Sequence, residues 1–262
     1  MLNGKVVVVT GSTSGIGLAI AKCFGREHCK VVLHGSRPLE RAQEAVDEVQ
    51  VVSDEGAVSY CQASLVEAEA GAKIVIDHAV EKFGTVDILV NNAGIQHVSS
   101  VDEFSTENWD RVIAVNLTAC FHTIRLSLPH MKASGWGRII NISSVHGLVA
   151  SANKSAYVAA KHGLNGLSKV VALENAGNGI TCNAVCPGWV HTPLVQKQID
   201  AIAEQKGLSP EAAVADLLSA KEPTKQFTLC EDIGEMCLFL SSKAGANLTG
   251  AELPMDGAWS TQ

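Results

Sequence analysis

The stretch TGSTSGIGLAI, residues 10–20, directly follows the apolar run KVVVVT and decides the fold. Its glycines Gly11, Gly15 and Gly17 follow a GxxxGxG spacing between an expected strand and an expected helix. Glycine lets the backbone turn tightly and approach a ligand closely, and the free amides at the start of a helix bind phosphate. No GK[ST] follows, so the turn predicts a dinucleotide site rather than a mononucleotide P-loop. The alternative is a turn that needs its glycines for packing only.

Short apolar runs recur along the chain, and amphipathic helical segments such as 39–50 and 73–84 lie between them. The runs are rich in valine and isoleucine and do not alternate with polar residues, which is typical of strands buried on both faces of a parallel sheet. This strand–helix alternation predicts an α/β fold with a Rossmann-like, doubly wound parallel sheet. The six clearest runs are residues 5–10, 30–35, 57–61, 86–92, 137–144 and 180–186.

The chain contains no linker, low-complexity tract or internal repeat, so we expect about seven strands in a single domain, residues 1–262. One segment, 192–227, departs from the strand–helix pattern, because it is polar and helical with a Gly-Leu-Ser-Pro break at 207–210. An insertion after the carboxyl end of a strand in such a sheet lies where ligands bind. We therefore expect 192–227 to be a helical lid over a substrate.

The composition is that of a compact protein, with 47% hydrophobic and 18% charged residues, and it excludes a disordered chain. A net charge of −7 without a basic run argues against a nucleic-acid partner. The eight cysteines form no CxxC pair, so we expect buried thiols in a reducing compartment and no metal site. The first strand begins by about Lys5, which leaves no room for a leader, and the longest uncharged run, 175–196, contains glycine, asparagine and proline. We therefore expect a cytoplasmic protein without a membrane span.

The stretch SAYVAAK, residues 155–161, places Tyr157 and Lys161 one helical turn apart on the same face. An ammonium beside a phenol stabilises the phenolate and so favours proton exchange near neutral pH. The alternative is an exposed helix on which Tyr157 packs and Lys161 is solvated. The other motifs of the chain decide between the two interpretations.

Further motifs accompany the glycine turn and SAYVAAK, and together they resemble the short-chain dehydrogenase/reductase family over essentially the whole chain. The resemblance implies an oxidoreductase that moves a hydride between a substrate and a nicotinamide dinucleotide. The motifs are NNAG (91–94), VNL (115–117), ISS (142–144), YVAAK (157–161) and PGWVHT (187–192).

The resemblance implies four catalytic residues. Tyr157 exchanges the proton with the substrate oxygen, and Ser144 hydrogen-bonds the same oxygen. Lys161 holds the nicotinamide ribose and supports the phenolate, while Asn116 supports a water-linked proton route from Lys161 to solvent. Such a set oxidises an alcohol without a metal ion.

The resemblance also implies NAD as the cofactor. The second expected strand ends in HGSRP (34–38), which has no acid for the ribose hydroxyls, and Arg37 can instead meet a 2′-phosphate, so NADP stays open. Arg37 over the adenine or in solvent is the other alternative. Family members commonly have aspartate near position 64, where this chain has Ser64. The expected cofactor residues are Gly11, Thr13, Ser14, Gly15, Ile16, Gly17, Arg37, Ser64, Leu65, Asn92, Ala93, Gly94, Tyr157, Lys161, Pro187, Gly188, Val190 and Thr192.

Within the family, the stretches 94–97, 143–163 and 187–199 resemble the members that interconvert (R)-3-hydroxybutyrate and acetoacetate. This resemblance implies a small anionic substrate. Lys154 supports it, because a cation at the start of a helix is disfavoured by the helix dipole unless an anion compensates. The expected substrate residues are Gln96, Ser144, His146, Lys154, Tyr157, Trp189, Gln198 and Trp259.

Each of these pocket residues also has an ordinary structural interpretation. Lys154 and Gln198 would be solvated side chains, His146 a loop histidine, and Trp259 a packed aromatic ring.

Two other functions stay open. The first is an NADPH-dependent reductase of 3-oxoacyl thioesters, which Arg37 favours and which Lys154 with His146 disfavours. The second is a cofactor-binding regulator without chemistry, which the intact Ser144 and Tyr157 disfavour because binding alone needs no proton relay.

The resemblance further implies a homotetramer, built through the helices that contain Asn116 and Tyr157 and through the C-terminal strand. The segment MDGAW (255–259) has Ala258 where the family often has glycine. We expect this alanine to be a mild change near a subunit contact.

Overall fold

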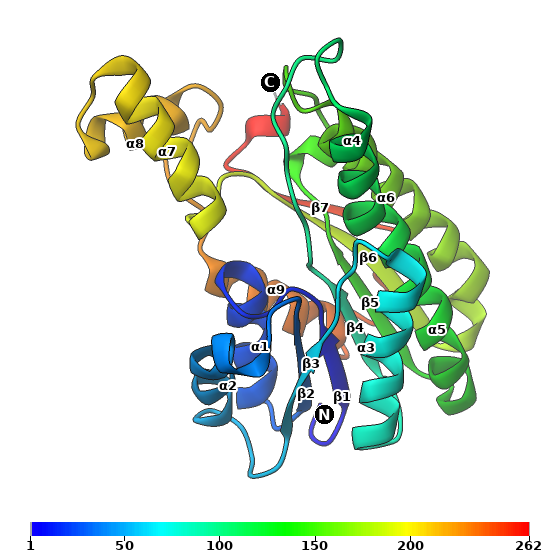
Figure 1. The fold of residues 1–262 in the computed structure, drawn as a ribbon. Coiled ribbons are helices and arrows are strands. Elements are labelled where there is room, and N and C mark those ends of the chain that lie inside the picture. The colour runs from blue at the N-terminus through cyan, green and yellow to red at the C-terminus, as the bar shows by residue number, and fades with distance from the viewer. Residues whose placement is uncertain (1, 262) are drawn as a thin grey trace.

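The computed structural model describes residues 2–261, so the two terminal residues of the predicted domain lie outside it. Its centre is a seven-stranded sheet in the order β3-β2-β1-β4-β5-β6-β7, with every neighbouring pair parallel (Figure 1). The predicted doubly wound sheet is therefore confirmed. The strands are β1 (Val6–Val9), β2 (Lys30–Gly35), β3 (Val58–Gln62), β4 (Ile88–Asn91), β5 (Gly137–Ile142), β6 (Ile180–Pro187) and β7 (Glu252–Met255).

Helices cover both faces of the sheet, and alternate residues of each strand pack against them (Figure 1). Val7 and Val9 of β1 face α1 and α9, whereas Val8 faces α3 and α5. This two-residue period, with both faces buried, explains why the strands are apolar without alternation. The helices are α1 (Gly15–Arg26), α2 (Gln43–Gln50), α3 (Ala68–Phe83), α4 (Thr106–Ile113), α5 (Ala119–Ser134), α6 (Ser155–Asn175), α7 (Pro193–Lys206), α8 (Pro210–Ser219) and α9 (Cys230–Ser241).

Several expected elements differ from the observed ones at their ends, and two of them are instructive. The run 86–92 forms a strand only at 88–91, because the backbone and side chain of Asn92 turn to hydrogen-bond Thr10 at the neighbouring strand end. The segment 39–50 divides into a 3₁₀ turn at Leu39–Arg41 and the helix α2. Neither difference changes the order of the strands or the edge of the sheet at which they end.

A continuous helical stretch, Thr106–Ser134, joins α4 and α5 through a π-helical turn at Ala114–Thr118. By length and composition alone, this stretch is apolar enough to cross a membrane. Its side chains Ile124 and Met131 instead pack under the sheet and are fully buried. The apolar character of the stretch therefore serves the core of the fold.

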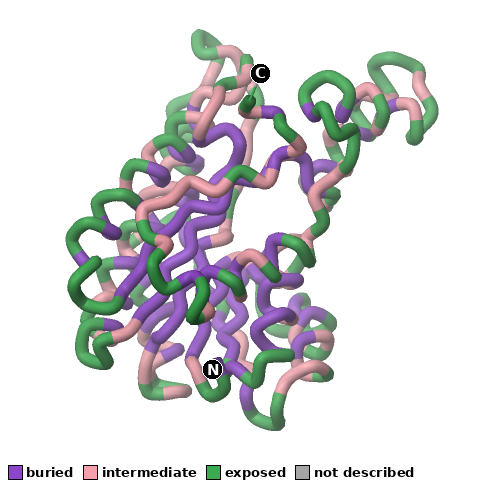
Figure 2. The backbone as a smooth tube through the Cα atoms, turned by 180° about the vertical axis from the view of Figure 1, so that it is seen from behind, coloured by how far each residue is buried: buried purple, intermediate pink, exposed green. Residues whose placement is uncertain are grey.

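Helices α7 and α8 form a pair that projects from the body of the protein, with many exposed residues (Figures 1 and 2). The break between them follows local rules, because Gly207 ends α7 in the left-handed region and Ser209 caps α8 through the amide of Ala212. Within the expected 192–227 segment, the residues after Ser219 are not helical and return to the body.

Strand order reverses between β1 and β4. Ligands of open α/β sheets bind beside this point, at the carboxyl ends of the strands. The loops after β1, β4, β5 and β6 all open there.

Candidate active site

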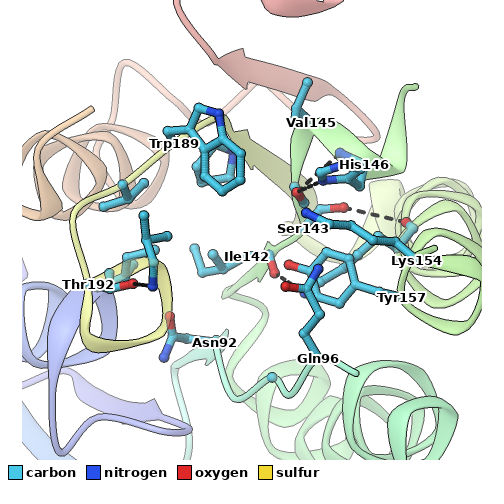
Figure 3. Close-up of a pocket in the computed structure, with 18 of the residues that line it drawn as sticks. Asn92, Gln96, Ile142, Ser143, Val145, His146, Lys154, Tyr157, Trp189 and Thr192 are labelled. Atoms are coloured by element: carbon cyan, nitrogen blue, oxygen red, sulfur yellow. Dashed lines mark hydrogen bonds between the residues drawn. The ribbon is translucent and has the colours of Figure 1, made fainter. Parts of the chain in front are cut away.

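A cavity of about 150 Å³ lies at the carboxyl ends of β4, β5 and β6, between α6 and the base of α7 (Figure 3). Segments that are far apart in sequence contribute its walls. Figure 3 shows Trp189 on one side and Gln96, His146, Lys154 and Tyr157 on the other. The structure brings together all of the predicted substrate residues around this cavity, namely Gln96, Ser144, His146, Lys154, Tyr157, Trp189, Gln198 and Trp259.

Helix α6 presents Tyr157 and Lys161 on the face that borders the cavity. The ammonium of Lys161 lies 5.5 Å from the centroid of the Tyr157 ring and donates a hydrogen bond to the carbonyl of Ile142 at 2.8 Å. Lys161 is only 3% exposed. The carbonyl at the end of β5 therefore holds the Lys161 ammonium in a buried position beside the Tyr157 ring.

Ser144 caps a short 3₁₀ turn after β5, and its hydroxyl accepts a hydrogen bond from the amide of His146 at 3.1 Å. The ring of His146 lies with Nδ1 3.4 Å from the same hydroxyl and Nε2 2.9 Å from the hydroxyl of Ser151. Burial, together with the charge of Lys154, lowers the pKa of His146 to about 3. The histidine is therefore neutral, and it orients groups in the site by hydrogen bonding rather than by charge.

Lys154 precedes α6 and extends over the wall residue Trp189, with its ammonium 5.1 Å from the indole centroid. Burial lowers the pKa of Lys154. Within residues 2–261, no carboxylate lies at ion-pair distance from this ammonium. A half-buried cation without a counter-ion is unfavourable, so the cavity is suited to an anionic ligand.

Two indole rings form the apolar wall opposite Tyr157. The centroids of Trp189 and Trp259 lie 5.6 Å apart, and His146 meets the Trp259 ring edge-on at 5.3 Å. Trp259 thus packs against aromatic neighbours and also lines the cavity. A wall of this kind accepts a small apolar group.

The backbone conformation of Ala258, in the turn before Trp259, differs from what the sequence predicted. Ala258 has a φ of +70°, in the left-handed region that favours glycine. The alanine is therefore a source of backbone strain beside the site rather than a mild change. The carboxylate of Asp256 supports this turn by accepting hydrogen bonds from the amides of Ala258 and Ser260.

A second cavity, of about 730 Å³, runs along the carboxyl ends of β1, β2, β3 and β4 and meets the first at Asn92 and Gly94. No acidic residue of the described chain lines it, while Arg37, Arg41 and Arg111 do. The two cavities form one groove along the strand ends. Of the predicted cofactor residues, the larger cavity contains Gly11, Thr13, Ser14, Arg37, Ser64, Leu65, Asn92, Ala93 and Gly94, and the smaller contains Ile16, Tyr157, Lys161, Pro187, Gly188, Val190 and Thr192.

The three glycines of the turn after β1 have different structural roles. Gly11 and Gly15 both have φ in the left-handed region, and Gly15 lines a separate neighbouring hollow. Gly17 lines neither part of the groove, and a Cβ there would lie 2.4 Å from the carbonyl oxygen of Gly11. Gly17 is therefore needed for close packing of the turn on the helix.

Asn116 lies behind the groove rather than in it. Its amide group is fully buried and exchanges two hydrogen bonds of 2.8 Å with the backbone of Ile95. A Cβ on Gly94 would lie 3.4 Å from Asn116 Oδ1 and 3.9 Å from Lys161 Nζ. Asn116 thus fixes the loop after β4 close to the buried ammonium.

Known proteins resemble this chain along most or all of its length. A family model described as short chain dehydrogenase matches residues 5–203. The chain belongs to the short chain dehydrogenase family. It is 49% identical over 262 residues to the D-beta-hydroxybutyrate dehydrogenase of Cupriavidus necator, with 100% of both chains covered. It is 47% identical to the D-beta-hydroxybutyrate dehydrogenase of Rhizobium meliloti, over 98% of this chain and 99% of that one.

A solved structure of levodione reductase has the same fold, with a TM-score of 0.89 and 29% sequence identity. The alignment covers 100% of this chain and 99% of the reductase. The family resemblance read from the motifs is therefore confirmed, and with it the assignment of the chain as an oxidoreductase.

The groove fits the dinucleotide that the family uses. Helix α1 points its amino end at the glycine turn and has no acidic residue in its first turn. The left-handed Gly11 and Gly15 leave room for close approach, and the arginines supply positive charge. The lining residues of the two cavities are therefore the ones that would hold such a cofactor.

Sequence reasoning missed a histidine beneath the glycine turn. His34, at the end of β2, accepts a hydrogen bond from the amide of Gly11 at Nδ1, 3.0 Å away, and places Nε2 3.1 Å from the carbonyl oxygen of Ala63. Burial lowers its pKa to about 4, so the ring is neutral, with its proton on Nε2. In the sequence it stands inside the apolar run KVVLHG, where no local signal marks a link to the turn.

Proposed function

We propose that this chain is a D-3-hydroxybutyrate dehydrogenase, which reversibly transfers a hydride between (R)-3-hydroxybutyrate and NAD to give acetoacetate and NADH. The observation that carries the proposal is the half-buried Lys154 ammonium, which has no counter-ion among residues 2–261 and lies in a small cavity that Tyr157 and Ser144 also line. Full-length similarity to two enzymes of that name supports the same substrate.

The chain's own residues handle the proton and the oxygen of the substrate. Tyr157 removes the hydroxyl proton as the alcohol is oxidised, and the buried Lys161 ammonium stabilises the phenolate that makes this possible. Ser144 donates a hydrogen bond to the same oxygen, while its hydroxyl oxygen accepts one from the amide of His146. The bound nicotinamide supplies the hydride chemistry.

The carboxylate of the substrate is held at the other end of the cavity. Lys154 supplies the positive charge, and the amides of Gln96 and Gln198 supply hydrogen-bond donors from two further segments. The neutral His146 orients Ser144 between these groups. Helices α7 and α8 act as a lid, since Gln198 and Val195 of α7 already line the cavity.

The methyl group and the chain length of the substrate are selected by the indole wall. Trp189 and Trp259 close the cavity on the apolar side. The cavity measures only about 150 Å³, and these rings bound it on one side, which favours a short acid over a long acyl chain.

The NADPH-dependent thioester reductase is the second candidate, and Arg37 and Arg41 at the end of β2 favour it. Initial rates with acetoacetate and acetoacetyl-CoA, each with NADH and NADPH, separate the two functions. We expect acetoacetate with NADH to give the highest kcat/KM. Reduction of the thioester without reduction of acetoacetate would overturn the proposed substrate, and a preference for NADPH would overturn NAD.

We also propose a cytoplasmic homotetramer. Within the described chain all eight cysteines are free, which suits a reducing compartment. Helices α5 and α6 expose Phe121 and Val170 along a shared groove, and such a surface is covered by a second subunit in a stable oligomer. Light scattering of the purified protein tests the mass, and a monomer at micromolar concentration contradicts the tetramer.

A further inference from the structure

A buried carboxylate beneath the substrate wall has no role in the mechanism described above. Glu222 follows α8 and is 1% exposed, and its Oε1 accepts a hydrogen bond from the amide of Trp189 at 2.6 Å. Gly188 leaves the space for this contact, because a Cβ at Gly188 would lie 2.2 Å from the same oxygen. The carboxylate therefore reaches the backbone of the wall at a position that is shaped for it.

The chain that returns from the lid also holds the other side of Trp189. The carbonyl oxygen of Trp189 accepts a hydrogen bond from the amide of Thr228 at 2.9 Å, and Val190 pairs with Thr228 in a short parallel bridge. Glu222 and Thr228 both belong to the segment 220–229 that follows α8. Both backbone polar groups of Trp189 are therefore bound to the end of the lid.

The position of Trp189 matters to the substrate cation. Its ring faces the Lys154 ammonium, 5.1 Å from the ring centroid (Figure 3), and packs beside the Trp259 ring in the same wall. Leu217 and Leu218 of α8 belong to the same apolar cluster as Trp189. A shift of the Trp189 backbone therefore changes the wall and the surroundings of Lys154 together.

The chemical state of Glu222 is unusual for a residue that only fills space. Burial, opposed by the hydrogen bond from Trp189 and reinforced by the negative charge of Asp256, raises its pKa to about 7. Among the described residues, its second oxygen has no hydrogen-bond partner. A buried carboxyl under these conditions is unfavourable for folding, and such arrangements are concentrated where position serves function.

We propose that Glu222 is a positioning residue that fixes Trp189 to the end of the lid and so sets the substrate wall opposite Lys154. This inference rests on the proposed function, because its consequence is an altered affinity for 3-hydroxybutyrate. The hydrogen bond between Glu222 and the Trp189 amide, called the clamp below, is a property of the fold and can be measured without a substrate.

Hydrogen exchange of the peptide that covers residues 187–192 measures the clamp without reference to a substrate. In NADH-bound protein, Glu222→Ala should speed exchange there about tenfold, since the Trp189 amide loses its acceptor. Glu222→Gln keeps an acceptor oxygen and should stay close to wild type. Glu204→Ala, which removes an exposed carboxylate from α7, is the matched control and should change nothing. Equal exchange in Glu222→Ala and wild type overturns the proposal.

Steady-state kinetics measures the consequence. Glu222→Ala should raise KM for (R)-3-hydroxybutyrate about tenfold, while kcat and the dissociation constant for NADH change by less than about threefold. Glu222→Gln should restore KM. An unchanged KM in Glu222→Ala contradicts the positioning role, and so does a parallel loss of NADH binding that Glu222→Gln fails to restore. If the wild-type protein does not oxidise (R)-3-hydroxybutyrate, the proposed function fails, while the exchange result still decides the clamp.

Discussion

The cofactor half of the groove is shaped mostly by backbone, whereas the substrate half is shaped by side chains from distant segments. In the cofactor half, left-handed glycines and a helix start create the ligand surface within one short stretch, 10–20. In the substrate half, Gln96, Lys154, Trp189 and Gln198 come from four separate segments and meet only in the folded protein.

The two halves of the groove also differ in how far their charged groups are buried. The cofactor half contains several exposed arginines, which attract phosphate from solvent at little desolvation penalty. The substrate half contains the half-buried Lys154 and the fully buried Glu222, whose ionised states are unfavourable without partners. The cofactor half therefore offers positive charge at little cost, whereas the substrate half places its charges at a cost in stability.

Removal of the phenol should have the largest effect, and it should separate the two halves. Tyr157→Phe loses the proton acceptor, so kcat should fall by about 10³-fold or more, because general acid–base catalysis typically contributes 10²–10⁴. The dissociation constant for NADH, measured by nucleotide fluorescence, should stay within about threefold of wild type. Residual turnover near the wild-type rate is incompatible with the mechanism.

Loss of the substrate cation should act on the substrate half alone. Lys154→Ala should raise KM for (R)-3-hydroxybutyrate by about 10²-fold, since a charge-assisted contact contributes about 1.5–3 kcal/mol. An uncharged secondary alcohol should show little change in KM, and so should NAD. Lys197→Ala, which removes an exposed lysine from α7, is the control. Equal effects on the acid and the uncharged alcohol would remove Lys154 from the anion site.

Acid should weaken the cofactor half through His34. Its folded-state pKa of about 4 lies below the ordinary value of 6.5, so the unfolded chain binds more protons between these values. The stabilisation is complete above pH 6.5 and is lost as pH falls toward 4, with about 2 kcal/mol lost between pH 7 and pH 5. Urea unfolding at the two pH values measures the loss. His34→Asn cannot titrate and should show a smaller difference, and an identical difference in both proteins contradicts this role.

The smallest expected effect concerns the strained turn beside Trp259. Ala258→Gly should stabilise the protein by about 0.5–1 kcal/mol, because the relief of left-handed strain exceeds the greater freedom of glycine in the unfolded chain. Thermal unfolding measures the shift. Ala244→Gly, in an exposed turn without positive φ, is the matched control and should destabilise slightly. A lower melting temperature for Ala258→Gly shows that the turn is not strained.

Most of the fold could be predicted from the sequence because the signals are local. Apolar runs without alternation and the glycine spacing each report on a few consecutive residues, and the parallel sheet follows from their order. The signal for the break between α7 and α8 is equally local, since Gly207 ends the first helix and Ser209 caps the second. Strand ends were less certain, because Asn92 leaves β4 for a partner about 80 positions away in sequence.

The substrate half could be predicted only in part. The resemblance supplied the residues that line the cavity, and the structure places them together. It did not reveal that His146 is neutral and engaged with Ser151, that Ala258 adopts positive φ, or that Glu222 supports Trp189. Each of these depends on burial and on contacts across the fold, which no short stretch of sequence encodes.

The most direct test of the account is how strongly the wild-type enzyme prefers a substrate that carries a carboxylate. The measurement is the ratio of kcat/KM for (R)-3-hydroxybutyrate to kcat/KM for (R)-2-butanol, an alcohol of the same length without the acid, at saturating NAD. Capture of the anion by the half-buried ammonium predicts a ratio of about 10² or more. A ratio near one would contradict it.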